Sequence, residues 1–208
     1  MILIGQYDSP FVRRVGIALT LYGLPFEHRP WSTFGDAEKL RQYNPLTRVP
    51  TLVLDDGEVL TDSHSILDYL DSLVPAERRM YPAAEPARHR ALRIAFLATG
   101  LGDKAASLFY EQLLHEQKSD LWVMRCRKQI SGALAVLEAD RAGRPGDYWF
   151  DNRIGHADIA VAAVLRFISE AHPGLVPMAD YPALSAHATR CEALPVFQEI
   201  MQPFIPPK

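Results

Sequence analysis

The 208-residue chain contains only two cysteines, Cys126 and Cys191, which lie far apart in the sequence. Disulfide frameworks and zinc sites need several cysteines or histidines at short, regular spacings. That pattern is absent, and the seven histidines show neither the HxxxH nor the HExxH spacing of metal-binding helices. We therefore expect a chain without disulfides and without a metal centre, in a reducing cytoplasm.

An excess of charge of one sign is also lacking, because 22 Lys and Arg residues stand against 25 Asp and Glu residues, for a formal net charge of -3. Nucleic-acid binding requires clustered Lys and Arg. The short basic groups Arg13-Arg14 and Arg125–Lys128 are expected to be solvated helix faces. No apolar run approaches the length of a membrane span, since Asp158 and Arg166 interrupt the longest one. We expect neither a nucleic-acid partner nor a membrane partner.

The chain divides into three stretches that differ in composition and in sequence pattern. Residues 1–75 alternate strand-like and helix-like patterns, residues 76–86 are rich in Pro, Ala and charge, and residues 87–208 contain almost no strand signal. A strand, a helix and a strand, followed by a hairpin and a helix, is the element order of the thioredoxin-like fold. These boundaries predict an α/β thioredoxin-like N-terminal domain, a linker, and an all-α helical bundle domain.

Periodicity and turn residues give the element order of the first stretch. Helical spacing runs from Phe11 to Tyr22 and stops at Gly23, and Asp56-Gly57 joins two short apolar runs as in a hairpin. The expected elements are strands Ile2–Ile4 and Phe26–Arg29, helix Phe11–Tyr22, a weak helix Asp36–Tyr43, strands Thr51–Leu54 and Glu58–Leu60, and a helix His64–Leu73 capped by Ser63.

Helical spacing dominates the third stretch. The segment Ala157–Ala171 is apolar on most sides, which predicts the central buried helix of a bundle. At its start, Asp158 can return a hydrogen bond to the backbone at Gly155, so we assign Asp158 a structural role. The other expected helices are Ala87–Gln117, either as one long helix or as a kinked pair that bends at Gly100 and Gly102, and then Ser119–Asp140, Pro182–Leu194 and Pro195–Met201.

The turn at Ser9-Pro10 closes the first apolar run and opens the first helix. A hydroxyl there lies beside helix N–H groups that lack intrahelical partners, and this arrangement favours an anion. Redox proteins of the thioredoxin-like fold have Cys-Pro-x-Cys at this turn, whereas this chain has Ser9-Pro10-Phe11-Val12. Disulfide exchange is therefore excluded here, and the Ser9 hydroxyl remains as a hydrogen-bond donor to a bound thiolate.

Two further residue pairs, Val49-Pro50 and Asp62-Ser63, each have a functional interpretation and a structural one. If the peptide bond of Val49-Pro50 is cis, the N–H and C=O of Val49 point outward and can pair with a short peptide; otherwise Pro50 is an ordinary turn proline. Asp62-Ser63 either simply caps a helix or holds the ammonium and carboxylate of a free amino-acid end. Glutathione has all three groups that these sites could bind: a thiol, a peptide backbone, and a free amino-acid end with an ammonium and a carboxylate.

Four motifs carry a resemblance to a known family over essentially the whole chain: Ser9–Val15, Asn44–Leu52, Asp62-Ser63 and Gly155–Ile159. With them the chain resembles the cytosolic glutathione transferases, in particular bacterial, serine-type members that share Ser-Pro-Phe-Val-Arg. The resemblance implies a homodimeric enzyme of electrophile detoxification, with glutathione as its co-substrate and a small hydrophobic electrophile as its second substrate.

The resemblance also implies residue roles at the glutathione site. Ser9 donates a hydrogen bond to the sulfur, Val49 before Pro50 pairs with the cysteinyl backbone, and Asp62 and Ser63 hold the γ-glutamyl end. Asp62 replaces the commoner Glu of the family, whose side chain is one methylene longer. This departure shifts the ammonium contact or passes it through water.

Other contacts are less sharply defined. Arg48, where many relatives have Lys or Gln, is expected near the glycyl carboxylate, and Thr47 replaces the usual Gly. Tyr7 is a rival to Ser9 as thiolate donor, because some family members use a tyrosine near the end of the first strand. The electrophile pocket is expected between the domains, and its candidate residues are Tyr7, Phe11, Phe34, Phe109 and Tyr110, with Phe11 and Tyr110 preferred.

The sequence leaves three functions open. The first is a transferase, with peroxidase or isomerase side activity as an open question. The second is a non-catalytic, protein-binding regulator that resembles the stringent starvation proteins. The third, a thiol-disulfide reductase, is disfavoured because Ser9 stands where such an enzyme needs a cysteine. The sequence identifies neither the electrophile nor whether glutathione is turned over or only bound.

Overall fold

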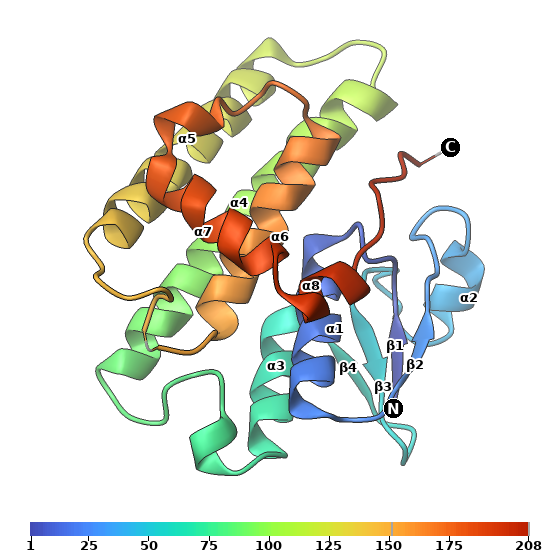
Figure 1. Cartoon of the computed structure of the whole chain (residues 1–208). Helices are drawn as coiled ribbons and strands as arrows, with labels where there is room; N and C mark the ends of the chain where they lie inside the picture. Colours follow the sequence, from blue (N-terminus) through green and yellow to red (C-terminus); the bar gives the residue numbers. More distant parts are fainter. Residues whose placement is uncertain (151, 208) are drawn as a thin grey trace.

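The computed structural model describes residues 1–150 and 152–207. A small sheet flanked by helices is followed by a group of longer helices (Figure 1). The first part contains β1 (Ile2–Ile4), α1 (Pro10–Tyr22), β2 (Glu27–Arg29), α2 (Ala37–Arg41), β3 (Thr51–Val53), β4 (Val59–Thr61) and α3 (Ser63–Ser72). The second contains α4 (Ala87–Leu114), α5 (Asp120–Ala142), α6 (His156–Ala171), α7 (Pro182–Glu192) and α8 (Pro195–Glu199). The α/β thioredoxin-like part and the helical part are as predicted.

The four strands form one mixed sheet in the order β2-β1-β3-β4. β1 pairs with β2 in parallel and with β3 antiparallel, so Leu3 lies opposite both His28 and Leu52. Side chains alternate between the two faces of the strands. Leu3 and Leu52 belong to the core under α1 and α3, whereas Ile4 packs with Leu40 of α2 on the other face.

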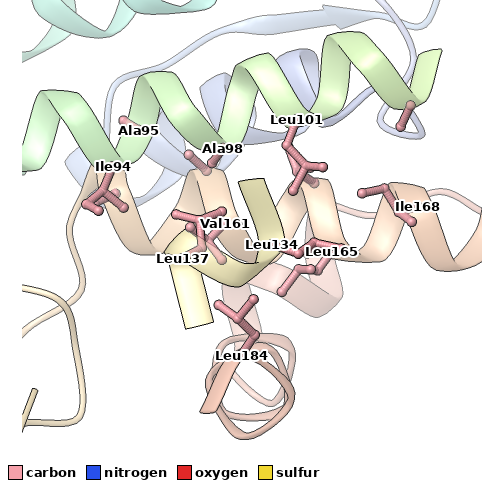
Figure 2. Packing of buried hydrophobic residues seen from close by; sticks show 14 of the residues in the cluster. Ile94, Ala95, Ala98, Leu101, Leu134, Leu137, Val161, Leu165, Ile168 and Leu184 are labelled. Carbon is pink, nitrogen blue, oxygen red and sulfur yellow. The ribbon is translucent and has the colours of Figure 1, made fainter. Parts of the chain in front are cut away.

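The core of the helical part lies between α4, α5, α6 and α7. α6 is buried on nearly all sides, as its apolar composition predicts. Figure 2 shows labelled side chains from these helices pointing into one cluster: Ile94, Ala98 and Leu101 of α4, Leu134 and Leu137 of α5, Val161 and Leu165 of α6, and Leu184 of α7. The helices that form the far wall of the site are therefore anchored in a continuous apolar core.

The start of α6 has the predicted capping arrangement. The Asp158 carboxylate accepts the N–H of Gly155 at 2.8 Å and also the N–H of Trp149 at 2.8 Å. Ile154 packs against the same core cluster as Ile159. Burial raises the pKa of Asp158 to about 6, against the lowering effect of these two N–H donors. Asp158 joins the end of the preceding loop to α6.

Arg13 and Arg14 are not the solvated helix face that their sequence predicts. Both side chains are 1% exposed. Arg13 forms a two-point ion pair with Glu192 at 2.6 and 2.7 Å and also donates to the carbonyl of Ile200. The prediction was wrong because these partners come from the far end of the chain, where a local pattern gives no information. Arg13 ties α1 to α7 and to the end of α8.

One prediction about a helix start needs correction. Asp62, not Ser63, is the N-cap of α3: its carboxylate accepts the N–H of His64 at 2.7 Å, and Ser63 is the first helical residue. Of the two alternatives for the next helix, the structure has the single long helix α4. A side chain at Gly102 would lie 3.2 Å from Val164 and 3.3 Å from Phe11, so this glycine permits close packing of α1 and α6 on α4.

Within residues 1–150 and 152–207, none of the helices combines the length and the apolar composition needed to cross a bilayer.

Candidate functional site

A cavity of about 640 Å³ lies between the first part of the chain and the helical part. Its walls come from the turn between β1 and α1, the loops after β2 and before β3, helices α4 and α6, and residues 204–207. Ser9, Phe11, Arg48, Val49 and Tyr110, which the sequence singles out, all line it. Pro50, Asp62 and Ser63 are not among its lining residues.

Ser9 lies where α1 begins, at the floor of this cavity. It is the N-cap residue with extended backbone geometry, and its Oγ accepts the N–H of Val12 at the long distance of 3.5 Å. The first turn of α1 contains no acidic side chain that would neutralise the positive end of the helix dipole. No histidine lines the cavity among the described residues, so the Ser-His pair that commonly activates a nucleophilic serine is not present there.

The Val49-Pro50 peptide bond is cis. The loop before it is held by the buried side chain of Asn44, which donates to the carbonyl of Arg48 at 3.0 Å and to Thr51 at 3.1 Å. Thr47 adopts a positive φ of 51°, a conformation that the commoner Gly of the family adopts more easily. Within the described residues, the N–H and C=O of Val49 form no hydrogen bond. An extended peptide in the cavity would find both groups available.

Arg48 faces α4 across the cavity mouth. Its guanidinium lies 3.7 Å from the carboxylate of Asp103, and both side chains are largely exposed. Burial raises the pKa of Asp103, the Arg48 charge lowers it, and the charge of Asp62 raises it further. Asp62 therefore lies near this wall, although it does not line the cavity itself.

Aromatic side chains cover the opposite wall. Phe11 packs against the backbone of α4 at Gly102, as described above. Tyr110 contacts Phe34, with ring centroids 5.6 Å apart, and Phe109 lies 5.9 Å from Tyr110. Phe34 and Phe109, both candidates from the sequence, also line the cavity. The wall is thus suited to an apolar, flat ligand.

Tyr7 is not one of the residues that line the cavity. Its ring stacks on His28 with centroids 3.9 Å apart and an interplanar angle of 12°. On its other side it meets α1 at Gly16, where an added side chain would lie 2.8 Å from the ring. Burial, with a smaller effect of the Glu199 charge, raises the pKa of Tyr7 to about 12. The tyrosine is partly buried and packs against the core cluster that contains the buried residues of α1.

The buried guanidinium of Arg14 lies beneath the start of α3. Ser63 is 2% exposed, and its Oγ accepts a hydrogen bond from Arg14 at 3.2 Å. Arg14 also donates to the hydroxyl of Tyr81 at 3.3 Å, and its Nε has no hydrogen-bond partner. No carboxylate of the described residues forms an ion pair with this guanidinium. A buried charge is normally paired, so the beginning of α3 is electrostatically suited to an anion.

His64, the second residue of α3, connects this helix to α4. Its ring stacks on Phe96, with centroids 3.7 Å apart, and its Nε2 lies 2.8 Å from the hydroxyl of Thr99. Burial, together with the nearby charge of Arg14, lowers the pKa of His64 to about 4. His64 is therefore neutral at neutral pH and does not add to the positive charge of Arg14.

Sequence reasoning missed two parts of the site. Asp8 lines the cavity next to Ser9, and its carboxylate accepts the N–H of Ile205 at 3.1 Å. The segment Phe204–Pro207, which follows α8 in the chain, also lines the cavity. The position of Asp8 directly before the Ser9-Pro10 turn was an available signal. The segment Phe204–Pro207 has no periodic pattern that would reveal its course.

Comparisons with known proteins agree on the family. Residues 3–78 match the model of the glutathione S-transferase N-terminal domain, and residues 94–190 match that of the C-terminal domain. The chain is 34% identical to the GST-like protein YibF of Escherichia coli over 66% of this chain and 68% of that one.

Two solved structures are also similar. One is a glutathione S-transferase of Methylobacterium radiotolerans in complex with glutathione sulfonate, with 30% identity, a TM-score of 0.92, and coverage of 100% of this chain and 97% of that one. The other is a glutathione transferase family member of Pseudomonas fluorescens with bound glutathione, with 31% identity, a TM-score of 0.85, and coverage of 98% and 99%. The chain belongs to the glutathione S-transferase family.

Proposed function

We propose that this chain is a glutathione transferase that binds glutathione, stabilises its thiolate through Ser9 and transfers the sulfur to a small apolar electrophile. The observation that carries this proposal is the Ser9 hydroxyl, at the open N-terminus of α1 on the floor of a cavity of about 640 Å³. The relatives of Methylobacterium radiotolerans and Pseudomonas fluorescens, which hold glutathione sulfonate and glutathione, support the choice of ligand.

The chemistry follows from the environment of the bound sulfur. A free cysteine thiol has a pKa of about 8.5, so only a small fraction is thiolate at neutral pH. The hydroxyl of Ser9 is available to donate, because its hydrogen bond within the described residues uses it as an acceptor. That donor and the end of the helix dipole both favour the ionised sulfur. The thiolate then attacks the electrophile held against the aromatic wall.

We propose that residues 1–75 form the glutathione-binding domain and residues 87–208 the helical domain. The remaining contacts place glutathione along the edge of the first domain. The backbone of Val49 pairs with the cysteinyl residue, since its N–H and C=O have no partner within the described residues. The start of α3, over Arg14, receives the α-carboxylate of the γ-glutamyl end, and Asp62 receives its ammonium. Arg48 at the cavity mouth is available to the glycyl carboxylate.

We also propose a homodimer in the cytoplasm. Large apolar side chains are exposed on α4 and α5, where a second copy would cover them: Phe96, Leu113, Leu114, Leu121 and Met124. Both cysteines are buried and free, which fits a reducing compartment. Sedimentation equilibrium tests the assembly, and a mass of 23.3 kDa, that of one chain, would contradict the dimer.

Calorimetric titration with glutathione is the decisive experiment. The peptide γ-Glu-Ala-Gly, which lacks the thiol, serves as the matched ligand. If the protein stabilises the thiolate, binding of glutathione releases protons into the buffer, and binding of γ-Glu-Ala-Gly does not. The proton release is measured from the dependence of the binding heat on the ionisation enthalpy of the buffer. Failure of glutathione to bind would end the proposal.

Turnover is then measured with aryl halides, peroxides and disulfides. We expect conjugation of an aryl halide, detected as loss of free thiol together with release of halide. Glutathione binding without turnover of any of these classes would contradict the transferase and favour the non-catalytic, protein-binding regulator. Turnover of disulfides alone would contradict conjugation as the main activity.

A further inference from the structure

The electrophile side of the cavity has a continuous aromatic wall. Phe204 meets Phe109 edge-to-face, with centroids 5.0 Å apart and an angle of 87°, and meets Phe167 at 5.7 Å. Phe109 continues to Tyr110, and Tyr110 to Phe34. Rings in this arrangement present both edges and faces to a flat guest. The wall combines side chains from α4, from α6, from the loop after β2 and from residues 204–207.

A single carboxylate, that of Asp8, interrupts this apolar lining beside Ser9. It accepts the backbone N–H of Ile205 at 3.1 Å, which fixes its place between the turn and the C-terminal segment. No Lys, Arg or His of the described residues forms an ion pair with it, and the nearby charge of Glu170 has the same sign. Burial raises the pKa of Asp8, as expected for a carboxylate without a cation to balance it.

The other charges that line the cavity balance one another. Arg48 and Asp103 lie 3.7 Å apart at the mouth, so their fields partly cancel inside. Gln6 is neutral, and no histidine contributes among the described lining residues. Asp8 is therefore the charged group, among the described residues that line the cavity, that no opposite charge balances.

We propose that the second substrate is a flat aromatic electrophile that carries a cationic group or a hydrogen-bond donor, and that Asp8 selects it against aromatic electrophiles that carry an anionic group. This inference rests on the proposed transferase function and names the substrate class of the same site. A desolvated like charge is a common means of rejecting wrong ligands, because the repulsion weakens little inside a partly closed cavity.

The reaction that tests the inference is displacement at a benzylic carbon. The thiolate sulfur of glutathione forms a bond to this carbon, and bromide leaves with the electron pair of the carbon–bromine bond. The thiol proton has gone to the solvent beforehand. No oxidant, reductant or further reactant is needed. Para-substituted benzyl bromides with a trimethylammoniomethyl, an ethyl or a carboxymethyl group differ in charge at a position remote from the reacting carbon.

For each bromide, kcat/KM is divided by the rate constant of the uncatalysed reaction with free glutathione, which removes differences in intrinsic reactivity. We expect the cationic compound to exceed the anionic one by about tenfold or more, with the neutral one between them. In Asp8→Asn this ratio falls to about one. An effect of Asp8 on the sulfur itself is common to all three compounds and cancels in the ratio.

Two control variants separate local from general charge effects. Asp8→Glu keeps the carboxylate and retains the preference. Glu77→Gln changes the net charge of the protein by the same amount as Asp8→Asn, but at an exposed position far from the cavity lining, and leaves the ratio unchanged. An equal ratio in the wild type and in Asp8→Asn overturns the inference, as does an equal shift caused by Glu77→Gln.

A binding measurement distinguishes failure of the inference from failure of the proposed function. The three S-benzylglutathione products are titrated by calorimetry, which needs no turnover. We expect the cationic product to bind about tenfold more tightly than the anionic one in the wild type and with equal affinity in Asp8→Asn. Binding of glutathione without this preference overturns the inference alone. Binding of neither glutathione nor its conjugates overturns the proposed function and the inference with it.

Discussion

Ser9 and Ser63 both stand at the start of a helix in the same small domain, yet they are in opposite environments. Ser9 lines a cavity, and its Oγ makes one long contact of 3.5 Å with the N–H of Val12. Ser63 is 2% exposed, and its hydroxyl is held by the buried Arg14. A weakly engaged, accessible hydroxyl can serve a ligand, whereas a buried, engaged hydroxyl serves the fold and acts on a ligand only through its neighbours.

The two helix starts also differ in how their charge is balanced. The first turn of α1 contains no acidic residue, and its residues Pro10 and Phe11 line the cavity. α3 begins behind the carboxylate of Asp62, but the guanidinium of Arg14 lies below it without a carboxylate partner in the described part of the chain. Both ends carry the positive end of a helix dipole, which favours an anion; the carboxylate of Asp8 lies beside the start of α1, whereas a buried cation lies beside the start of α3.

The largest effect is expected for Ser9→Ala. Removal of the donor lowers kcat/KM about a hundredfold, as for other single donors to a developing or bound anion. The pH profile of kcat/KM moves to higher pH, because the thiol returns toward its ordinary pKa of about 8.5 and less thiolate is present at neutral pH. The affinity for glutathione changes much less, since the peptide contacts remain. Stopped-flow or steady-state rates across a pH series measure both quantities.

Two comparisons sharpen the Ser9→Ala result. Ser9→Thr keeps the hydroxyl and retains most of the activity and the position of the pH profile. The free energy of unfolding of Ser9→Ala falls by less than about 1 kcal/mol, because the cap hydrogen bond is long. An unchanged pH profile together with a large loss of stability would assign Ser9 to the fold and refute it as the thiolate donor.

The contrast between the two serines also marks how far the sequence could be interpreted. The position of Ser9 was predictable because a strand, a turn and a helix of regular periodicity follow one another within a few residues. The cap of α3 was assigned one residue too late, since Asp62 and Ser63 are both good capping residues and local sequence does not choose between them. The apolar stripe of α3 still predicted the helix itself.

Long-range contacts were beyond local sequence patterns. Arg13 is buried by Glu192, Ile200 and Phe197, and Arg14 by Ser63 and Tyr81, so neither burial follows from the spacing of the first helix. The same holds for the cavity wall at residues 204–207, which contacts Asp8 at the opposite end of the chain. The resemblance to the glutathione transferases predicted glutathione as the ligand, but it did not predict that Asp8 lines the cavity.

An intermediate effect, mainly on stability, is expected for Ser63→Ala. The change leaves a buried N–H of Arg14 without its acceptor, which costs about 1–3 kcal/mol of unfolding free energy. Urea denaturation followed by circular dichroism measures this loss. KM for glutathione rises because the start of α3 is disturbed, while kcat at saturation changes little. Ser72→Ala, at an exposed position of the same helix, is the matched control and stays within about 0.5 kcal/mol. If kcat falls strongly while the free energy of unfolding changes little, Ser63 acts on the reaction as Ser9 does, and its structural role is contradicted.

The smallest effect is expected for Tyr7→Phe, which tests the rival donor directly. The ring remains stacked on His28 and packed against Gly16, so the fold keeps its contacts and only the hydroxyl is lost. Because Tyr7 does not line the cavity and burial raises its pKa to about 12, we expect kcat/KM to change less than about twofold. The pH profile also stays in place. If Tyr7→Phe instead moves the profile to higher pH while Ser9→Ala leaves it unchanged, the tyrosine is the donor and the cavity-facing serine is only the cap of α1.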